Sequence, residues 1–411
     1  MTASLRRAAG SLLVVGLGGT ELTGLERAWL RVVRPAGIIL FRRNIAAAEQ
    51  TRALLDEATG LSGTHSLRCV DVEGGTVDRL RDALAPLPSA QAVARADQYS
   101  TLSQKTRKDG APRLGEGVTT QIPMSQKRDM GHPVPVDGAR GFPRLAREHG
   151  ELVARAVKAF GFNTTLAPVL DLGLPESSQV MGTRIAAATV TGVVAYARGF
   201  LNGLAAQGVI GCGKHFPGLG GGTRDSHLET PAIRRDGREL WLEDLAPYRD
   251  LRNELPMVMV NHAAYPETPG KARPASVSPY WITTVLRKKI GYRGIVFSDD
   301  LEMGGILRYM PIEEAAVSAV RAGMDLMEIC HSPELILRAY EALIAEAERS
   351  RGFAELITTR ARRTEKLRAK LFAGGIGRAL TQRQFEALRT RVLRFSEMTA
   401  RSQAVAEAPI A

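Results

Sequence analysis

Residues 294–300 read GIVFSDD, a short apolar run that ends in two adjacent carboxylates, Asp299 and Asp300. Seven other short runs are similarly apolar and rich in β-branched residues: LLVVG (12–16), GIILF (37–41), LRCVDVE (67–73), TTLAPVLD (164–171), GVIGCGKHF (208–216), MVMVNHA (257–263) and LMEIC (326–330). Runs that are apolar along nearly their whole length are typical of strands buried on both faces of a parallel sheet. The sequence therefore predicts eight such strands.

Longer stretches with helical periodicity separate most of these runs, for example ELTGLERAWLRVVR (21–34) and PIEEAAVSAVRAG (311–323). Strands that alternate with helices eight times predict an α/β fold, a single (β/α)8 barrel of the TIM type. Residues 1–375 are expected to form this domain, with a loop insertion at 98–141 that is rich in Gly, Pro, Ser and Thr. Residues 376–411 are expected to form a helical or disordered tail.

Composition excludes several classes of protein. The chain has 411 residues and is 44% hydrophobic and 24% charged, which is ordinary for a globular protein. Its net charge of +12 is spread along the chain without a basic patch interleaved with aromatics, so no nucleic-acid partner is expected. No run approaches the ~20 apolar residues of a membrane span. Three dispersed cysteines without a C-x-x-C pair predict reduced core thiols and a cytoplasmic location.

Polar residues gather where the predicted strands end. Strand three ends in Asp71 and Glu73, strand four in Asp171, strand five in Lys214 and His215, strand six in Asn261 and His262, strand seven in Asp299 and Asp300, and strand eight in His331. Active sites of this fold lie at the carboxyl ends of the strands. Charged groups there are costly unless paired or functional, so this pattern predicts a catalytic cleft.

Two common chemistries fit these residues poorly. No H-x-H or H-E-x-x-H spacing is present, so no metal is expected. The glycines of GVIGCGKH have Walker A spacing, but His215 stands where Ser or Thr is required, which argues against a phosphate loop.

Acid/base and nucleophilic catalysis on a polar substrate fits better. Asp299 is a candidate carboxylate nucleophile of the kind that retaining glycosidases use. Asp225 could hold His227 in one tautomer for proton transfer, although Asp225-Ser226-His227 alone is equally typical of an Asx turn.

Five segments together resemble family 3 glycoside hydrolases of the bacterial β-N-acetylglucosaminidase type: DVEGGTVDRL, LAPVLDL, KHFPGLGGGTRDSHLETP, MVMVNHAAYP and GIVFSDDLEMGG. They occur in the family's order and spacing over roughly residues 10 to 370, outside the insertion. Three departures stand out. Leu219 replaces a common second His, Val72 replaces a usual Gln, and the S-F-G that usually follows Arg184 is missing.

The resemblance implies a role for each matching residue. Asp299 corresponds to the nucleophile that forms a covalent glycosyl-enzyme, and Asp225 with His227 to the acid/base dyad. Five residues correspond to groups that hold the sugar: Asp71, Arg79, Arg184, Lys214 and His215.

The predicted activity is that of a cofactor-independent, monomeric, retaining exo-β-N-acetylglucosaminidase. Its small carbohydrate substrate would be a GlcNAc-containing muropeptide from peptidoglycan turnover. Two alternatives are a β-glucosidase-like hexosidase of the same family and a catalytically impaired sugar-binding protein. Phosphate could also replace water as the acceptor.

Overall fold

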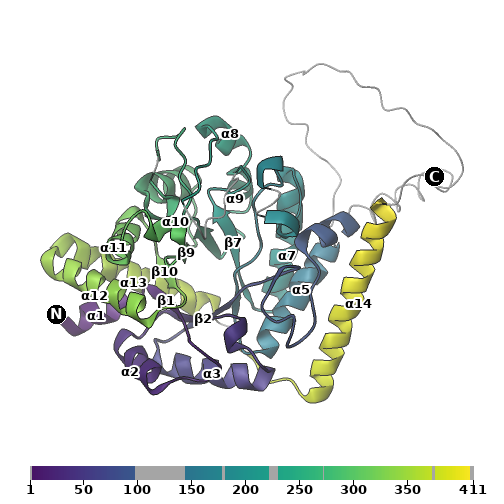
Figure 1. Cartoon of the computed structure of the whole chain (residues 1–411), viewed down its shortest axis with the longest axis horizontal. Helices are drawn as coiled ribbons and strands as arrows, with labels where there is room; N and C mark the ends of the chain where they lie inside the picture. The colour runs from purple at the N-terminus through teal and green to yellow at the C-terminus, as the bar shows by residue number, and fades with distance from the viewer. Residues whose placement is uncertain are drawn as a thin grey trace, which may run out of the picture.

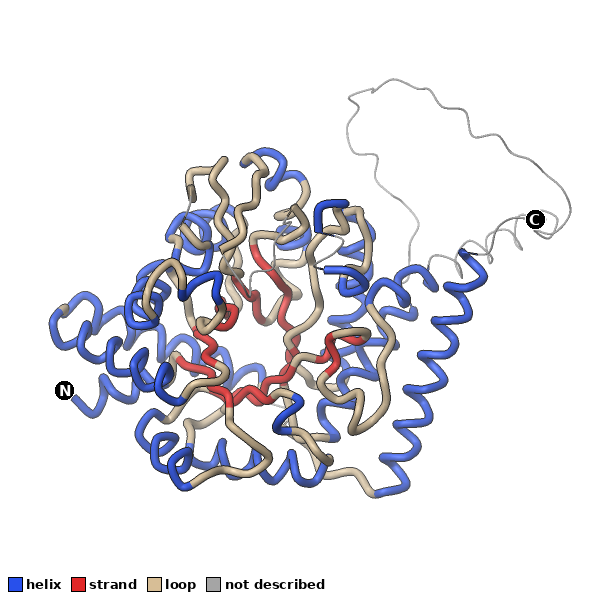
Figure 2. Tube along the Cα trace, viewed as in Figure 1, coloured by secondary structure: helices blue, strands red, loops and turns tan. Residues whose placement is uncertain are grey.

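A closed barrel of eight parallel strands forms the centre of the computed structural model, which describes residues 2–97, 144–177, 181–221, 230–271, 273–372 and 375–407 (Figure 2). The strand order is β1-β10-β9-β8-β7-β6-β3-β2. The strands are β1 (Leu13–Gly16), β2 (Gly37–Leu40), β3 (Leu67–Val70), β6 (Thr164–Thr165), β7 (Ile210–Phe216), β8 (Met257–Val260), β9 (Ile295–Asp300) and β10 (Leu326–Ile329). Each falls within one of the eight apolar runs, so the predicted (β/α)8 fold is confirmed.

Helices surround the barrel and connect its strands (Figure 1). In chain order they include α2 (Gly24–Val33), α3 (Ala48–Leu61), α5 (Arg144–Ala159), α7 (Val190–Ala206), α8 (Gly237–Leu242), α9 (Ala246–Asp250), η5 (Tyr280–Lys289), α10 (Gly304–Leu307), α11 (Ile312–Ala322) and α12 (Pro333–Arg349). Local sequence fixes some of their ends. Helix α2 begins at a capping box in which the Thr23 hydroxyl accepts from the Glu26 amide and the Glu26 carboxylate accepts from the Thr23 amide.

The barrel interior is filled by alternate residues of the strands. Val14, Ile39, Cys69, Cys212 and Phe297 belong to one buried cluster that lies inside the ring. This is the expected filling of a barrel of this size, which is a packed core and not a pore. Cys69, Cys212 and Cys330 are all free and buried, as the sequence predicted.

A small antiparallel pair, β4 (Val72–Gly74) and β5 (Val77–Asp78), follows β3 on the rim. Its turn depends on glycine. Gly74 and Gly75 have φ of +90° and +62°, and a Cβ on Gly74 would lie 2.0 Å from the Pro88 carbonyl oxygen. This tight turn fixes the place of Glu73 beside the barrel mouth.

The C-terminal part of the chain is helical. Helix α13 (Arg351–Leu371) follows α12, and α14 (Gln382–Glu407) lies along α5, where it buries Leu388, Val392 and Phe395 (Figure 1). The insertion predicted at 98–141 lies outside the described residues, and the proposed division at residue 375 stays a prediction. None of the described helices has the length and hydropathy needed to cross a membrane.

Candidate active site

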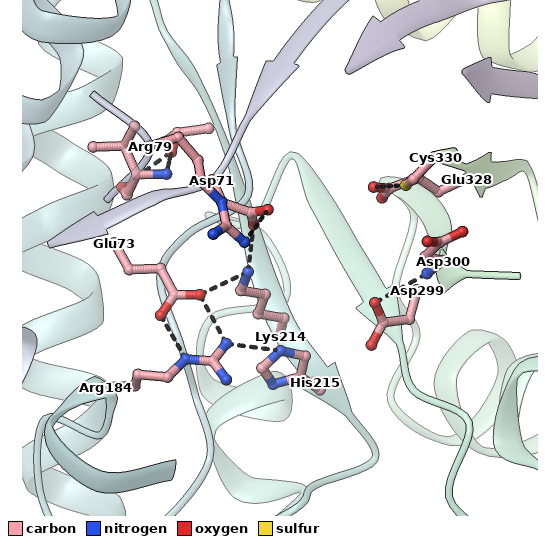
Figure 3. A network of polar contacts seen from close by, with 12 residues as sticks. Asp71, Glu73, Arg79, Arg184, Lys214, His215, Asp299, Asp300, Glu328 and Cys330 are labelled. Carbon is pink, nitrogen blue, oxygen red and sulfur yellow. Dashed lines mark hydrogen bonds and ion pairs between the residues drawn. The ribbon is translucent and has the colours of Figure 1, made fainter. Parts of the chain in front are cut away.

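Side chains from β4, from β7 and from Asp71, which directly follows β3, form a charged network at the carboxyl ends of the strands (Figure 3). Lys214 is its centre. The Lys214 Nζ lies 2.9 Å from Asp71 Oδ1 and 2.7 Å from Glu73 Oε1. The Lys214 side chain is only 4% exposed, so these contacts carry its charge in a nearly dry environment. We name the set Asp71, Glu73, Arg79, Arg184, Lys214 and His215 the paired cluster.

Arg184 holds Glu73 from the opposite side. Its Nε donates to Glu73 Oε2 at 2.9 Å and its Nη2 to Glu73 Oε1 at 2.8 Å, a bidentate pair. Burial alone would raise the pKa of Glu73, but the charges of Arg184 and Lys214 outweigh burial and hold it well below its usual value. The same carboxylates raise the pKa of Lys214 and of Arg184 despite burial. All three groups are therefore ionised near neutral pH.

His215 is oriented by a buried carboxylate. Its Nδ1 lies 2.7 Å from Asp171 Oδ2, and its Nε2 lies 3.3 Å from Arg184 Nη2. Asp171 also accepts from the backbone amides of His215 and Leu219. Arg79 completes the paired cluster more loosely, since its Nη2 lies 3.8 Å from Asp71 Oδ2 and its side chain is 31% exposed.

Asp299 faces this cluster from β9 on the other side of the barrel mouth (Figure 3). Its Oδ1 accepts from the Asp300 amide at 3.0 Å. Burial alone would raise the pKa of Asp299, but the positive potential of His215, His262 and Lys214 leaves it below the ordinary value. Asp299 is thus a partly exposed carboxylate that stays anionic, which is what a carboxylate nucleophile requires.

Two further carboxyl groups, Glu328 and Asp300, lie beside Asp299, and no described lysine or arginine pairs with either. Glu328 points from β10, and its Oε1 accepts from the Cys330 thiol at 2.9 Å. Its Oε2 is buried and has no hydrogen-bond partner among the described residues. Burial and the charges of Asp300 and Asp71 raise the pKa of Glu328 well above its usual value. Burial, together with the negative charges of Glu302 and Asp299, raises the pKa of Asp300 to about 7. We name Asp299, Asp300, Glu328 and Cys330 the unpaired cluster.

The structure brings six of the eight predicted site residues to one rim, the five sugar-binding candidates and Asp299. Asp225 and His227 lie outside the described residues. Sequence reasoning did not assign a site role to Glu73, although the polar strand end after β3 had pointed to it. It also missed Glu328, whose signal was a lone acid within the apolar run LMEIC.

One group among the described side chains could offer three ligand atoms to a metal ion: Asp300, Glu302 and His331, within 4.8 Å of one another. Glu302 already accepts from the backbone amides of His331 and Ser332, at 2.5 and 2.6 Å. This use as a loop anchor accounts for the position of Glu302 without an ion.

A (β/α)8 barrel with an anionic carboxylate facing a cation-paired cluster on its carboxyl rim has the layout of a hydrolase for polar substrates. Comparison with known proteins identifies the family. Residues 109–367 match the model of the glycosyl hydrolase family 3 N-terminal domain. The chain belongs to this family and is a glycoside hydrolase.

Curated relatives carry the name β-hexosaminidase. The protein of Alkalilimnicola ehrlichii is 36% identical over 325 residues, 79% of this chain and 82% of its own length. That of Stenotrophomonas maltophilia strain R551-3 is 32% identical over 84% of this chain and 90% of its own. Among solved structures, NagZ from Neisseria gonorrhoeae is 28% identical with a TM-score of 0.66, covering 94% of this chain and 98% of its own. A family 3 β-N-acetylglucosaminidase from Paenibacillus is 27% identical with a TM-score of 0.75, covering 95% of this chain and 68% of its own.

Proposed function

We propose that this β-hexosaminidase is a retaining exo-β-N-acetylglucosaminidase that removes terminal GlcNAc from peptidoglycan turnover fragments in the cytoplasm. The observation that carries the proposal is the pairing of an anionic Asp299 with the paired cluster across the barrel mouth. The names of the relatives support the N-acetylated sugar as substrate.

Asp299 is assigned the attack on the anomeric carbon. Its carboxylate oxygen forms a bond to that carbon as the bond to the leaving oxygen breaks, which gives a covalent glycosyl-enzyme. Because the pKa of Asp299 lies below its ordinary value, the nucleophile stays ionised even in mildly acidic solution. Water then attacks the same carbon and releases the sugar with its original configuration.

The paired cluster is assigned to the sugar hydroxyls. Arg79 is the most exposed charge of the cluster, with a side chain 31% exposed, and Asp71, at 13%, is more exposed than Glu73 or Lys214, so both can exchange water for sugar. Lys214 and Arg184 hold the carboxylates in place before substrate arrives, which reduces the entropy lost on binding. His227, oriented by Asp225, is assigned the proton transfer to the leaving oxygen.

Two measurements on the purified enzyme test the proposal. Initial rates on 4-nitrophenyl β-N-acetylglucosaminide and β-glucoside should differ clearly in favour of the N-acetyl sugar. Proton NMR of the first product formed should show the β-anomer before mutarotation. Formation of the α-anomer first would rule out the retaining mechanism. Preference for the glucoside would indicate a β-glucosidase-like hexosidase. No turnover of either substrate would indicate a sugar-binding protein.

The muropeptide assignment needs its own experiment. Turnover of GlcNAc-anhydro-muropeptides should exceed that of chitobiose at equal concentration, as judged by kcat/KM. The reverse order would assign the enzyme to chitin fragments while leaving its glycosidase activity intact.

A further inference from the structure

A second polar site lies at the opposite end of the barrel, where the strands begin. Helix α13 closes this end, because Leu367, Leu371 and Phe372 pack against the cluster inside the ring. Between α13, α1 (Thr2–Gly10) and the loops that precede β2 and β3 lies a pocket of about 130 Å³. Its lining includes four arginines and one carboxylate, namely Arg7, Arg34, Arg362, Arg368 and Glu365.

Arg368 is the buried part of this pocket. The residue is 2% exposed, and its Nη1 donates to the carbonyl oxygens of Ala36 at 2.8 Å and His65 at 3.0 Å. These bonds use one edge of the guanidinium. Its Nε is buried without a partner, and no described residue accepts from its Nη2. Since protein atoms enclose Nε, Nη2 is the donor that Arg368 can offer to a ligand in the pocket it lines.

No carboxylate among the described residues forms an ion pair with Arg368. Burial lowers the pKa of Arg368 to about 10, Glu365 only partly opposes this, and Arg7 lowers it further. Glu365 accepts a hydrogen bond from the Thr64 hydroxyl at 3.1 Å. Arg7, Arg34 and Arg362 form no ion pair with any carboxylate in the described part of the chain. The pocket therefore carries an excess of positive charge around a buried, half-satisfied cation.

We propose that this pocket, lined by Arg7, Arg34, Arg362 and Arg368, binds a small tetrahedral oxyanion, a phosphate group. The pocket is large enough for this ligand, since about 10–15 Å³ of such space already holds one water. A doubly charged oxyanion would accept from Nη2 of Arg368 and compensate the charges of the neighbouring arginines. It would also connect α1 and α13 to the barrel, and a ligand that binds only the folded state stabilises it.

Titration calorimetry with inorganic phosphate, at fixed ionic strength set with chloride, tests the site in the full-length wild type. A saturable one-to-one isotherm is expected. The double variant Arg7→Gln/Arg362→Gln should weaken phosphate binding at least about tenfold, because it removes two of the cations that face the ligand. It keeps Arg368 and its carbonyl contacts, so its folding is preserved. The matched control Arg389→Gln/Arg394→Gln removes the same charge from α14 and should bind phosphate like the wild type.

The sugar site also contains cations, so the experiment must separate the two ends of the barrel. Arg184→Gln, which alters the paired cluster, should leave phosphate binding unchanged. Glycerol phosphate distinguishes a phosphate monoester from the free ion, because tighter binding of the ester would identify an organic phosphate as the ligand. Equal or weaker binding of the ester would identify the free ion.

Three results would overturn the proposal. These are the absence of saturable binding in the wild type, an equal loss in the α14 control, and a loss in Arg184→Gln with none in Arg7→Gln/Arg362→Gln. None of them bears on the glycosidase assignment, which rests on the other end of the barrel.

Discussion

The two sides of the barrel mouth hold similar numbers of acidic groups but treat their charge in opposite ways. In the paired cluster, Lys214 contacts both Asp71 and Glu73, and Arg184 binds Glu73 with two hydrogen bonds. In the unpaired cluster, the described residues offer Glu328 and Asp300 no cation within ion-pair distance except the exposed His331, which lies 3.7 Å from Asp300. The first side is organised to stay fixed and charged, whereas on the second side Asp300 and Glu328 have raised pKa values beside an Asp299 that stays anionic. This is the division expected between holding a substrate and reacting with it.

The largest effect should follow from removing the charge of the reactive side. Asp299→Asn keeps the shape of the side chain but removes the nucleophile, so kcat should fall on the order of 10⁴- to 10⁶-fold. Steady-state rates on an aryl β-N-acetylglucosaminide measure this loss, and circular dichroism verifies the fold.

Asp300→Asn is the matched control, because it makes the same chemical change one residue away. Asp300 has a pKa of about 7 and its main-chain amide, not its side chain, contacts Asp299. Its kcat should therefore fall far less. Equal losses in the two variants would remove the special role of Asp299.

The next largest effect should come from removing the cation that neutralises the carboxylates of the paired cluster. Lys214→Met leaves Asp71 and Glu73 buried with one fewer cation, which should reduce the free energy of unfolding by about 3–5 kcal/mol. Sugar binding should weaken as well, because Asp71 loses its close partner while Glu73 keeps only Arg184. Urea denaturation and KM measure the two effects.

The double variant Lys214→Met/Asp71→Asn tests whether the cost is electrostatic. Without Lys214, Asp71 keeps only the 3.8 Å contact to Arg79, so neutralising Asp71 should return part of the stability while KM stays high. If stability does not recover, the cost of Lys214→Met comes from altered packing and not from an unpaired carboxylate charge.

Much of this arrangement could be predicted from the sequence, because each strand signal is local. The eight apolar runs gave the barrel, and the polar residues that end them gave Asp71, Lys214, His215 and Asp299. The contact between Glu73 and Arg184 was beyond reach, because 111 residues separate the two and only the closed barrel joins β4 to the segment before α7.

Glu328 shows a different limit. A single acid within LMEIC fits a strand whether its side chain points to solvent or inward. Only the register of the strand decides which way the side chain points. Glu328 pairs with Val14 of β1 and Asp300 of β9. Leu326 and Cys330, two residues away on either side, both lie in the interior cluster. Because side chains alternate between the two faces of a strand, Glu328 also points into the barrel interior. An acidic residue is disfavoured there.

Removing this buried acid should stabilise the protein, the opposite of the Lys214 result. The pKa of Glu328 is raised in the folded state, so the folded protein holds a proton that the unfolded chain releases above its ordinary pKa near 4.5. The cost of Glu328 therefore grows as pH rises from that value. Glu328→Leu should raise the free energy of unfolding by about 2 kcal/mol at pH 8, with a smaller gain at pH 5.

Urea denaturation at the two pH values checks this prediction, with kcat measured alongside. Glu328→Gln is the control for shape, since it keeps the acceptor for the Cys330 thiol but does not titrate. A loss of stability at both pH values would mean that Glu328 is satisfied by a partner and belongs with the paired side.

The smallest effect on stability should come from Arg79, the most exposed cation of the paired cluster. Its ion pair with Asp71 is long, at 3.8 Å, and solvent screens it, so Arg79→Gln should cost less than about 1 kcal/mol in urea denaturation. KM should nevertheless rise, because exposure is what lets this guanidinium meet a sugar hydroxyl. The result separates two kinds of cation within one cluster: Lys214 supports the fold and the site together, whereas Arg79 serves the site alone. A stability loss comparable to that of Lys214→Met would show that the cluster acts as a single structural unit.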